Sequence, residues 1–116
     1  MKKIPKKFQI GSYTIKVVML DVAAFERKVS PDAYGMFDPN TLTIYLCKSP
    51  PQLKGAEQHV FQCFWHEYCH ALLFVVWPKL YTNEKLVDAM GHSLAQLMNT
   101  STFTQSSKKP KKTATK

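Results

Sequence analysis

The segment CFWHEYCHALLFVVW, residues 63–77, constrains the fold of this chain more than any other stretch, because it is almost entirely apolar. Apolar side chains recur at every fourth residue in and just before it, at Val60, Phe64, Tyr68 and Leu72. This spacing is typical of an amphipathic helix, and no helix-breaking residue follows until Pro78. We therefore predict one helix of about twenty residues that begins near Gly55 and packs this stripe against the rest of the chain.

The sequence before this helix has the pattern of β-strands. Strands are predicted at residues 8–10, 13–20, 34–37 and 41–47, with the clearest alternation of apolar and polar residues in the second and fourth. Gly11-Ser12 joins the first pair in a tight turn, and Asp38-Pro39-Asn40 joins the second pair. The stretch Asp21–Val29 fits either a short helix or a crossing between strands. We expect these strands to form an antiparallel sheet.

A second helix is predicted to begin at Thr82 or Asn83, either of which can cap it, and to run to about Met98. Its apolar stripe consists of Leu86, Met90, Leu94 and Leu97. The composition then changes to Ser, Thr, Lys and Pro, which cannot bury enough surface to fold. We therefore predict a single domain over residues 8–99, with a basic lead-in at 1–7 and a basic disordered tail at 100–116.

The predicted fold class is a small α+β domain in which an antiparallel sheet packs on the long helix and a second helix completes the structure. A chain of 116 residues has room for one domain, which excludes a Rossmann pair, a TIM barrel or a second catalytic domain. The three cysteines, Cys47, Cys63 and Cys69, lack the spacing of a disulfide scaffold, which favours a reducing compartment. No signal peptide is evident, and the longest apolar run is too short to cross a bilayer. We expect a cytoplasmic protein without membrane contact.

The formal charge of +8 comes from the two ends of the chain, where nine of the sixteen lysine and arginine residues lie. Clustered lysines can neutralise phosphate, so weak nonspecific contact with nucleic acid is one interpretation of these tails. They contain no interleaved aromatic side chain or arginine that would read bases. A solubilising role is therefore the favoured interpretation.

The sequence His66-Glu67-Tyr68-Cys69-His70 matches the pattern H-E-x-x-H in the middle of the predicted long helix. Residues four apart lie on one helix face, so the two imidazoles can converge on a metal ion. Glu67 points about 100° away from His66 and can serve as general base for a water that the metal activates. Burying these three groups without partners would cost several kcal/mol, which favours a metal site over an accidental pair, although a structural or degenerate site would match the same pattern.

A catalytic zinc ion needs a third protein ligand and an open position. Glu84 and Asp88 share a face at the start of the second helix, and His92 lies one turn further on the same face. Each of these side chains is a candidate third ligand, and the acidic pair could also be an ordinary helix start.

H-E-x-x-H followed by N-E-x-x-x-D at residues 83–88 resembles the gluzincin clan of zinc metallopeptidases, of which thermolysin is the familiar member. The order of hairpin, H-E-x-x-H helix and Glu-bearing helix is similar to the small phage-borne, minigluzincin-like peptidases, including the ImmA/IrrE group. The resemblance implies a zincin-like fold and one bound Zn²⁺, and it suggests a phage-encoded protein that acts in the host cytoplasm.

The resemblance also implies the roles of individual residues. His66, His70 and Glu84 would bind the zinc, Glu67 would polarise the water, and Asp88 would hydrogen-bond a ligand histidine, His66 by preference. The implied function is hydrolysis of peptide bonds in a peptide or protein substrate. With His92 as third ligand the chain would instead resemble the SprT-like, DNA-associated metalloproteases, and a chain that lost its cleft would be a non-catalytic zinc-binding interaction protein.

Other side chains near the motif each fit more than one role. Tyr81 could polarise a substrate carbonyl or simply pack, and His59 lies on the rim of the site or has no role in it. Cys69 is expected in the core, whereas Cys63 is either buried or, less expected, a ligand. The segment Gly35-Met36-Phe37 could be an edge strand to which a peptide substrate adds, or an ordinary edge strand.

Overall fold

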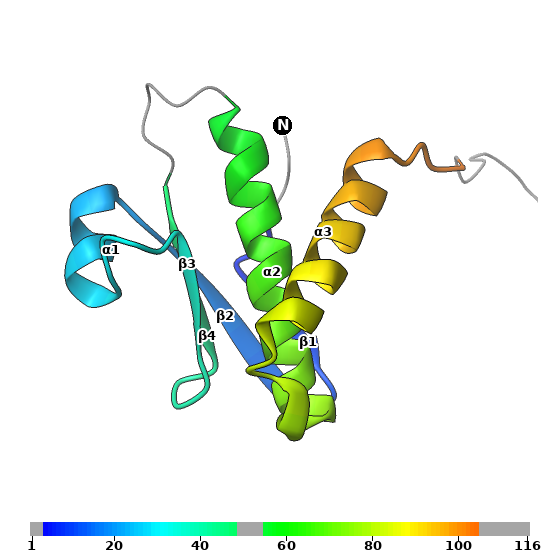
Figure 1. The fold of residues 1–116 in the computed structure, drawn as a ribbon, viewed down its shortest axis with the longest axis horizontal. Coiled ribbons are helices and arrows are strands. Elements are labelled where there is room, and N and C mark those ends of the chain that lie inside the picture. Colours follow the sequence, from blue (N-terminus) through cyan, green and yellow to red (C-terminus); the bar gives the residue numbers. More distant parts are fainter. Residues whose placement is uncertain (1–3, 49–54, 105–116) are drawn as a thin grey trace, which may run out of the picture.

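A four-stranded sheet packs against one side of a long helix in the computed structural model, which describes residues 4–48 and 55–104 (Figure 1). The elements in chain order are β1 (Lys7–Ile10), β2 (Tyr13–Leu20), α1 (Val22–Lys28), β3 (Gly35–Asp38), β4 (Thr43–Cys47), α2 (Ala56–Val76), the short 3₁₀ helix η1 (Pro78–Leu80) and α3 (Glu84–Thr100). The fold is therefore α+β, as predicted. Of the predicted basic lead-in and disordered tail, residues 1–3 and 105–116 lie outside the described residues.

The strands lie in the order β1-β2-β4-β3, and both predicted hairpins, β1/β2 and β3/β4, are antiparallel. The two hairpins meet through β2 and β4, which run parallel with Val17 opposite Ile44. The sheet is thus mixed, and the prediction of an antiparallel sheet is wrong. The reason is that α1 and β3 carry the chain back along the sheet, so β4 starts at the same end as β2.

The ambiguous stretch after β2 is the helix α1. The Asp21 side chain caps this helix by accepting a hydrogen bond of 2.8 Å from the backbone N–H of Ala24. Phe25 is fully buried where α1 packs on β2 and β4. The helix therefore covers one end of the sheet, on the way from β2 to the second hairpin.

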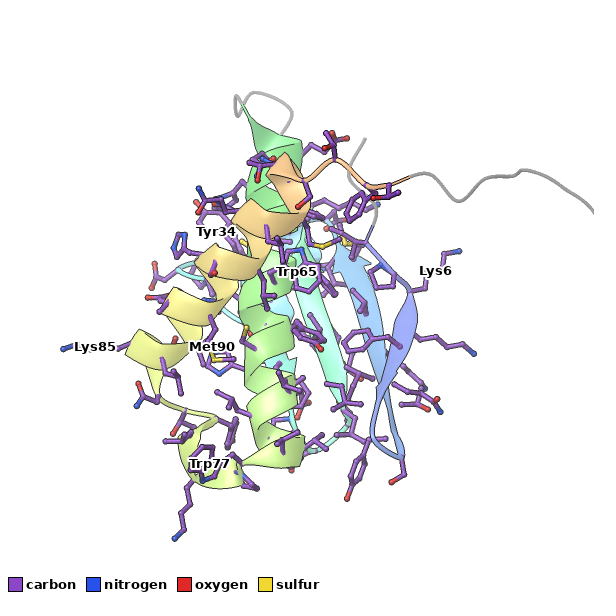
Figure 2. The ribbon with its side chains drawn as sticks, turned by 90° about the vertical axis from the view of Figure 1, so that its right-hand side faces the viewer. Lys6, Tyr34, Trp65, Trp77, Lys85 and Met90 are labelled. Atoms are coloured by element: carbon purple, nitrogen blue, oxygen red, sulfur yellow. The ribbon has the colours of Figure 1, made fainter. Side chains whose placement is uncertain are left out.

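The core lies between the sheet and α2. Ile15, Ile44 and Leu46 are fully buried on the sheet side and meet Phe64 of α2, so the alternation read from the sequence identifies the inward face correctly. Helix α2 has α3 on its other side (Figure 1). Aromatic side chains of α2 such as Trp65 fill the space beside β1 (Figure 2). No helix within the described ranges is long and apolar enough to cross a bilayer.

Helix α3 begins as predicted but packs differently. The Asn83 side chain caps it by accepting from the backbone N–H of Leu86 at 3.0 Å. The buried residues are Val87, Gly91 and Ala95, whereas Leu97 is 57% exposed, so the prediction of Leu97 in the buried stripe is wrong. The other residues of the predicted stripe, Leu86, Met90 and Leu94, are half-buried and pack against the α2 contact around Val87.

Gly91 marks the closest approach of α3 to α2. A Cβ atom at this position would lie 3.0 Å from the Cα and 3.2 Å from the backbone nitrogen of His66. Because backbone atoms of a helix cannot move aside like a flexible side chain, any larger residue would push α3 away.

We expect Gly91→Ala to destabilise the protein by about 1–3 kcal/mol, although Gly→Ala inside a helix ordinarily stabilises by about 1 kcal/mol. Urea unfolding monitored by circular dichroism would measure the change. Ser93→Ala, at an exposed position of the same helix, should stay within about 0.5 kcal/mol of the wild type. Equal or greater stability of Gly91→Ala would contradict the close helix contact.

Candidate metal centre

Three side chains that can bind a metal converge where α2 meets the start of α3. His66 and His70 project from neighbouring turns of α2, and Glu84 is the first residue of α3. Nε2 of His66 lies 3.3 Å from Oε1 of Glu84, and Nε2 of His70 lies 3.3 Å from Oε2 of the same carboxylate. Candidate ligand atoms from all three residues lie within 4.8 Å of one another, so this group could hold a metal ion.

Each imidazole also makes a hydrogen bond through its Nδ1 atom, on the side of the ring away from Glu84. Nδ1 of His66 lies 3.0 Å from Oδ1 of Asp88, and Nδ1 of His70 lies 2.5 Å from the carbonyl oxygen of Tyr81. Both partners are acceptors, so each Nδ1 carries the hydrogen and donates it. With the hydrogen on Nδ1, each ring can present an Nε2 lone pair towards Glu84.

With both rings in this form, two lone pairs and a carboxylate face one point and could share a cation between them. Protonating both imidazoles would place two positive rings with centroids 5.0 Å apart, which costs Coulomb energy. A metal ion satisfies all three groups without that repulsion. In metal centres of this kind, hydrogen bonds to the Nδ1 atoms orient the imidazole rings, as they do here.

Glu67 lies beside this group but faces the sheet, where it is only 7% exposed. The backbone N–H of Phe37 in β3 donates a hydrogen bond to its carboxylate, which lowers its pKa. Burial, and then the negative charge of Glu84, outweigh that bond and raise the pKa of Glu67 to about 8. A carboxyl group with this pKa can both accept and release a proton near neutral pH.

Gly35 gives Glu67 the room that it occupies. A Cβ atom at position 35 would lie 3.0 Å from Cγ and 3.1 Å from Oε2 of Glu67. Sequence reasoning had placed Gly35 in a possible edge strand, and β3 is indeed an edge strand of the sheet. The contact between Gly35 and Glu67 was not predicted, although a glycine inside a strand often marks a place where another group approaches the backbone closely.

The structure distributes the other predicted residues around this centre. Asp88 contacts His66, the partner that the family resemblance implied. Tyr81 acts on His70 through its backbone carbonyl, while its ring packs on Phe74 with centroids 5.3 Å apart. His92 is not in the cluster found among the described residues; it lines an adjoining cavity.

The cysteines are likewise separated from the cluster. Cys69 is fully buried, as expected of a core residue. Cys63 is half-buried and lies against His59 rather than the three converging side chains.

Comparison with known proteins finds no matching family model, no similar curated protein and no similar solved structure. The function is therefore argued from the geometry of this cluster.

The raised pKa of Glu67 predicts how the metal-free protein depends on pH. The folded state binds the Glu67 proton more tightly than the unfolded state, so this contribution to stability is complete below about pH 4.5 and is lost as the pH rises towards 8. Glu67→Gln removes this loss. The variant should gain at least about 1 kcal/mol over the wild type between pH 5 and pH 9 in urea unfolding with a chelator present.

Glu57→Gln is the matched control, because Glu57 is exposed near the start of the same helix. It should retain the pH trend of the wild type. A difference between Glu67→Gln and wild type that stays constant from pH 5 to pH 9 would contradict the raised pKa.

Proposed function

We propose that this chain is a zinc-dependent metallopeptidase of the zincin type. One observation carries the proposal: the Nε2 atoms of His66 and His70 and the carboxylate of Glu84 face a common point, next to a buried carboxyl group that is not itself part of the cluster. Metal ligands with an adjacent general base are the combination that metal-assisted hydrolysis requires.

The donor set fits zinc. Zinc binds imidazole nitrogen and carboxylate oxygen at about 2.0–2.1 Å, and tetrahedral ligands with such bonds lie about 3.3 Å apart. Each imidazole lies at that spacing from one of the two carboxylate oxygens, 3.3 Å in both cases, and the three candidate ligand atoms lie within 4.8 Å of one another. When bound, zinc supplies a Lewis acid that polarises the scissile carbonyl and acidifies a water molecule. Asp88 and the Tyr81 carbonyl hold the two imidazoles in the orientation needed for binding.

Glu67 has the role of general base and then general acid. It accepts a proton from the attacking water and transfers it to the nitrogen of the leaving amine. The Phe37 N–H keeps the carboxylate in place during both transfers. A cation held by the neighbouring ligands favours the ionised form of Glu67, opposing the effect of burial.

The edge strand β3 offers a place for an extended substrate. It pairs with β4 on one side only, and hollows of about 290 Å³ and 360 Å³ lie along it, meeting at Gly35, His66 and Glu67. A peptide that adds to an exposed strand gains backbone hydrogen bonds, and its alternate side chains enter pockets. We infer that the substrate is an extended peptide segment that crosses the centre along β3.

One prediction of this proposal concerns the third ligand of the metal. Glu84→Ala should weaken zinc binding by about 100-fold or more, and Asp88→Asn by about 10–100-fold, because one removes a ligand and the other loosens a ligand ring. Competition with a chelating dye would measure the affinities. His92→Ala should bind zinc like the wild type, and loss of zinc from His92→Ala but not from Glu84→Ala would reverse the assignment.

A further prediction of this proposal concerns the effect of Glu67 on hydrolysis. Glu67→Gln should retain bound zinc but hydrolyse peptides about 10²–10⁴-fold more slowly, since it removes the proton carrier and leaves the ligands in place. The assay would use zinc-loaded protein and a randomised peptide mixture, with new peptide termini counted by mass spectrometry. Glu57→Gln should match the wild type. Undiminished hydrolysis by Glu67→Gln would exclude this mechanism, and zinc binding without any hydrolysis by the wild type would instead indicate a non-catalytic zinc protein.

A further inference from the structure

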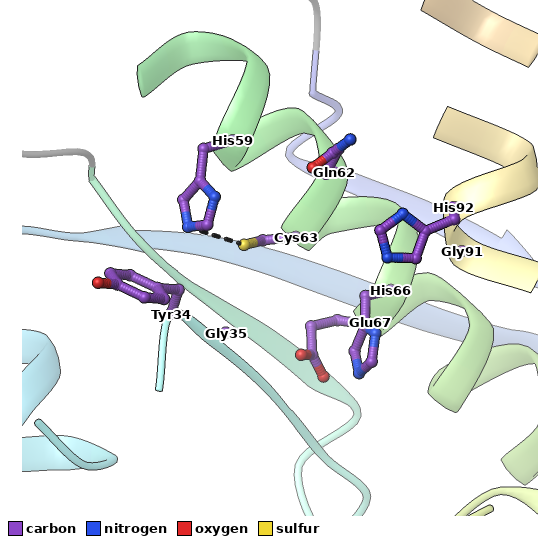
Figure 3. A pocket seen from close by; sticks show the side chains of 9 residues that line it. All are labelled: Tyr34, Gly35, His59, Gln62, Cys63, His66, Glu67, Gly91 and His92. Carbon is purple, nitrogen blue, oxygen red and sulfur yellow. Dashed lines mark hydrogen bonds between the residues drawn. The ribbon is translucent and has the colours of Figure 1, made fainter. Parts of the chain in front are cut away.

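A cavity of about 360 Å³ adjoins the metal centre on the side away from Tyr81. Gly35, His66 and Glu67 form its border with the centre, and the rest of its lining comes from the start of β3, the first half of α2 and the middle of α3 (Figure 3). Its polar side chains include His59, Gln62 and His92, none of which the proposed hydrolysis uses. A pocket this close to the reacting bond would receive a substrate side chain.

His59 is positioned by two neighbours. Its Nε2 lies 3.7 Å from Sγ of Cys63, and its ring meets the Tyr34 ring edge-on with centroids 4.7 Å apart. Burial, with the charge of Glu67 and then Cys47 adding to it, raises the pKa of the Cys63 thiol to about 11, so the thiol is neutral and donates to Nε2. When Nε2 accepts from the thiol, the ring hydrogen lies on Nδ1, which can donate to a ligand.

The remaining polar groups of the cavity also offer N–H donors. Gln62 has a primary amide, and His92 projects an imidazole from α3 on the far side of the opening (Figure 3). Among the described residues that line the cavity, Glu67 is the only one with a carboxyl group, and it accepts from the Phe37 N–H. A lysine or arginine side chain would therefore meet no acidic partner except the proposed base. A carboxylate would meet several donors and accepts without needing acceptors in return.

We propose that this cavity, lined by His59, Gln62 and His92, selects a substrate residue with a carboxylate side chain next to the cleaved bond. This inference rests on the proposed peptidase function, since it assigns the specificity of the same site. His59 of α2 and His92 of α3 are its specificity-determining residues, one from each helix that lines the cavity.

The test measures binding rather than turnover, so that it does not depend on hydrolysis. Zinc-loaded protein is titrated with dipeptide hydroxamates, in which the hydroxamate binds the metal and the adjacent side chain is that of Glu, Gln, Leu or Lys. The Glu compound should bind about tenfold more tightly than the Gln and Leu compounds, and the Lys compound most weakly. In the double variant His59→Phe/His92→Phe, the Glu and Leu compounds should bind about equally.

Two controls separate recognition from structural damage. The Leu compound should bind the double variant about as well as the wild type, which shows that the metal centre is intact. Gln96→Leu, at an exposed position one turn beyond His92 on α3, should keep the full preference for Glu.

Equal binding of the four compounds to the wild type, or a preference for Glu that survives the double substitution, would overturn the assignment of this cavity. A preference for Glu in a protein that hydrolyses no peptide would support the cavity and contradict the peptidase. Failure of every hydroxamate to bind would overturn the metal centre and the cavity together.

Discussion

The close contact between α3 and α2 at Gly91 is the constraint on which the candidate site depends. Because a glycine hydrogen faces the backbone of His66, the two helices approach closely enough for the start of α3 to reach the histidines. Glu84 and Asp88 then contact His66 from the first and second turns of α3. A wider separation would carry both carboxylates away from the imidazoles. One residue without a side chain thus allows the ligand and its supporting carboxylate to meet the same ring.

Glu67 illustrates a conflict between stability and chemistry. Its carboxyl group is buried against β3, where the hydrogen bond from the Phe37 N–H favours the charged form and the negative charge of Glu84 opposes it. A sequence selected only for stability would place glutamine or an apolar residue here. The cost of keeping Glu67 is understandable if the group must hold and release a proton. A cation bound by the neighbouring cluster would stabilise the folded state by mass action.

The sequence predicted the individual strands and hairpins better than the way in which the two hairpins pair with each other. Alternation identified both hairpins and the inward face of the sheet, because side-chain period is a local property. The parallel pairing of β2 with β4 depends on how α1 and β3 return the chain, which no local pattern records. Leu97 was assigned to the core from its spacing in the apolar stripe, whereas the buried face of α3 is centred on Val87, Gly91 and Ala95. In the site, spacing predicted that His66 and His70 converge, and the family resemblance implied Glu84 beside them. The Tyr81 carbonyl that orients His70 is a backbone atom and has no signature in the sequence.

The candidate site is exposed to solvent at Glu84 and buried at Glu67, and β3 covers the buried side. The Glu84 side chain is 67% exposed, so the metal cluster is open to solvent over the start of α3. Glu67 is covered instead by β3, and Gly35 of the same strand borders the histidine-lined cavity. A peptide bound along β3 would therefore shield the proton carrier further from water at the moment when its side chain enters that cavity. Since the low dielectric of a dehydrated site strengthens every charge interaction in it, substrate recognition and proton transfer would depend on the same strand.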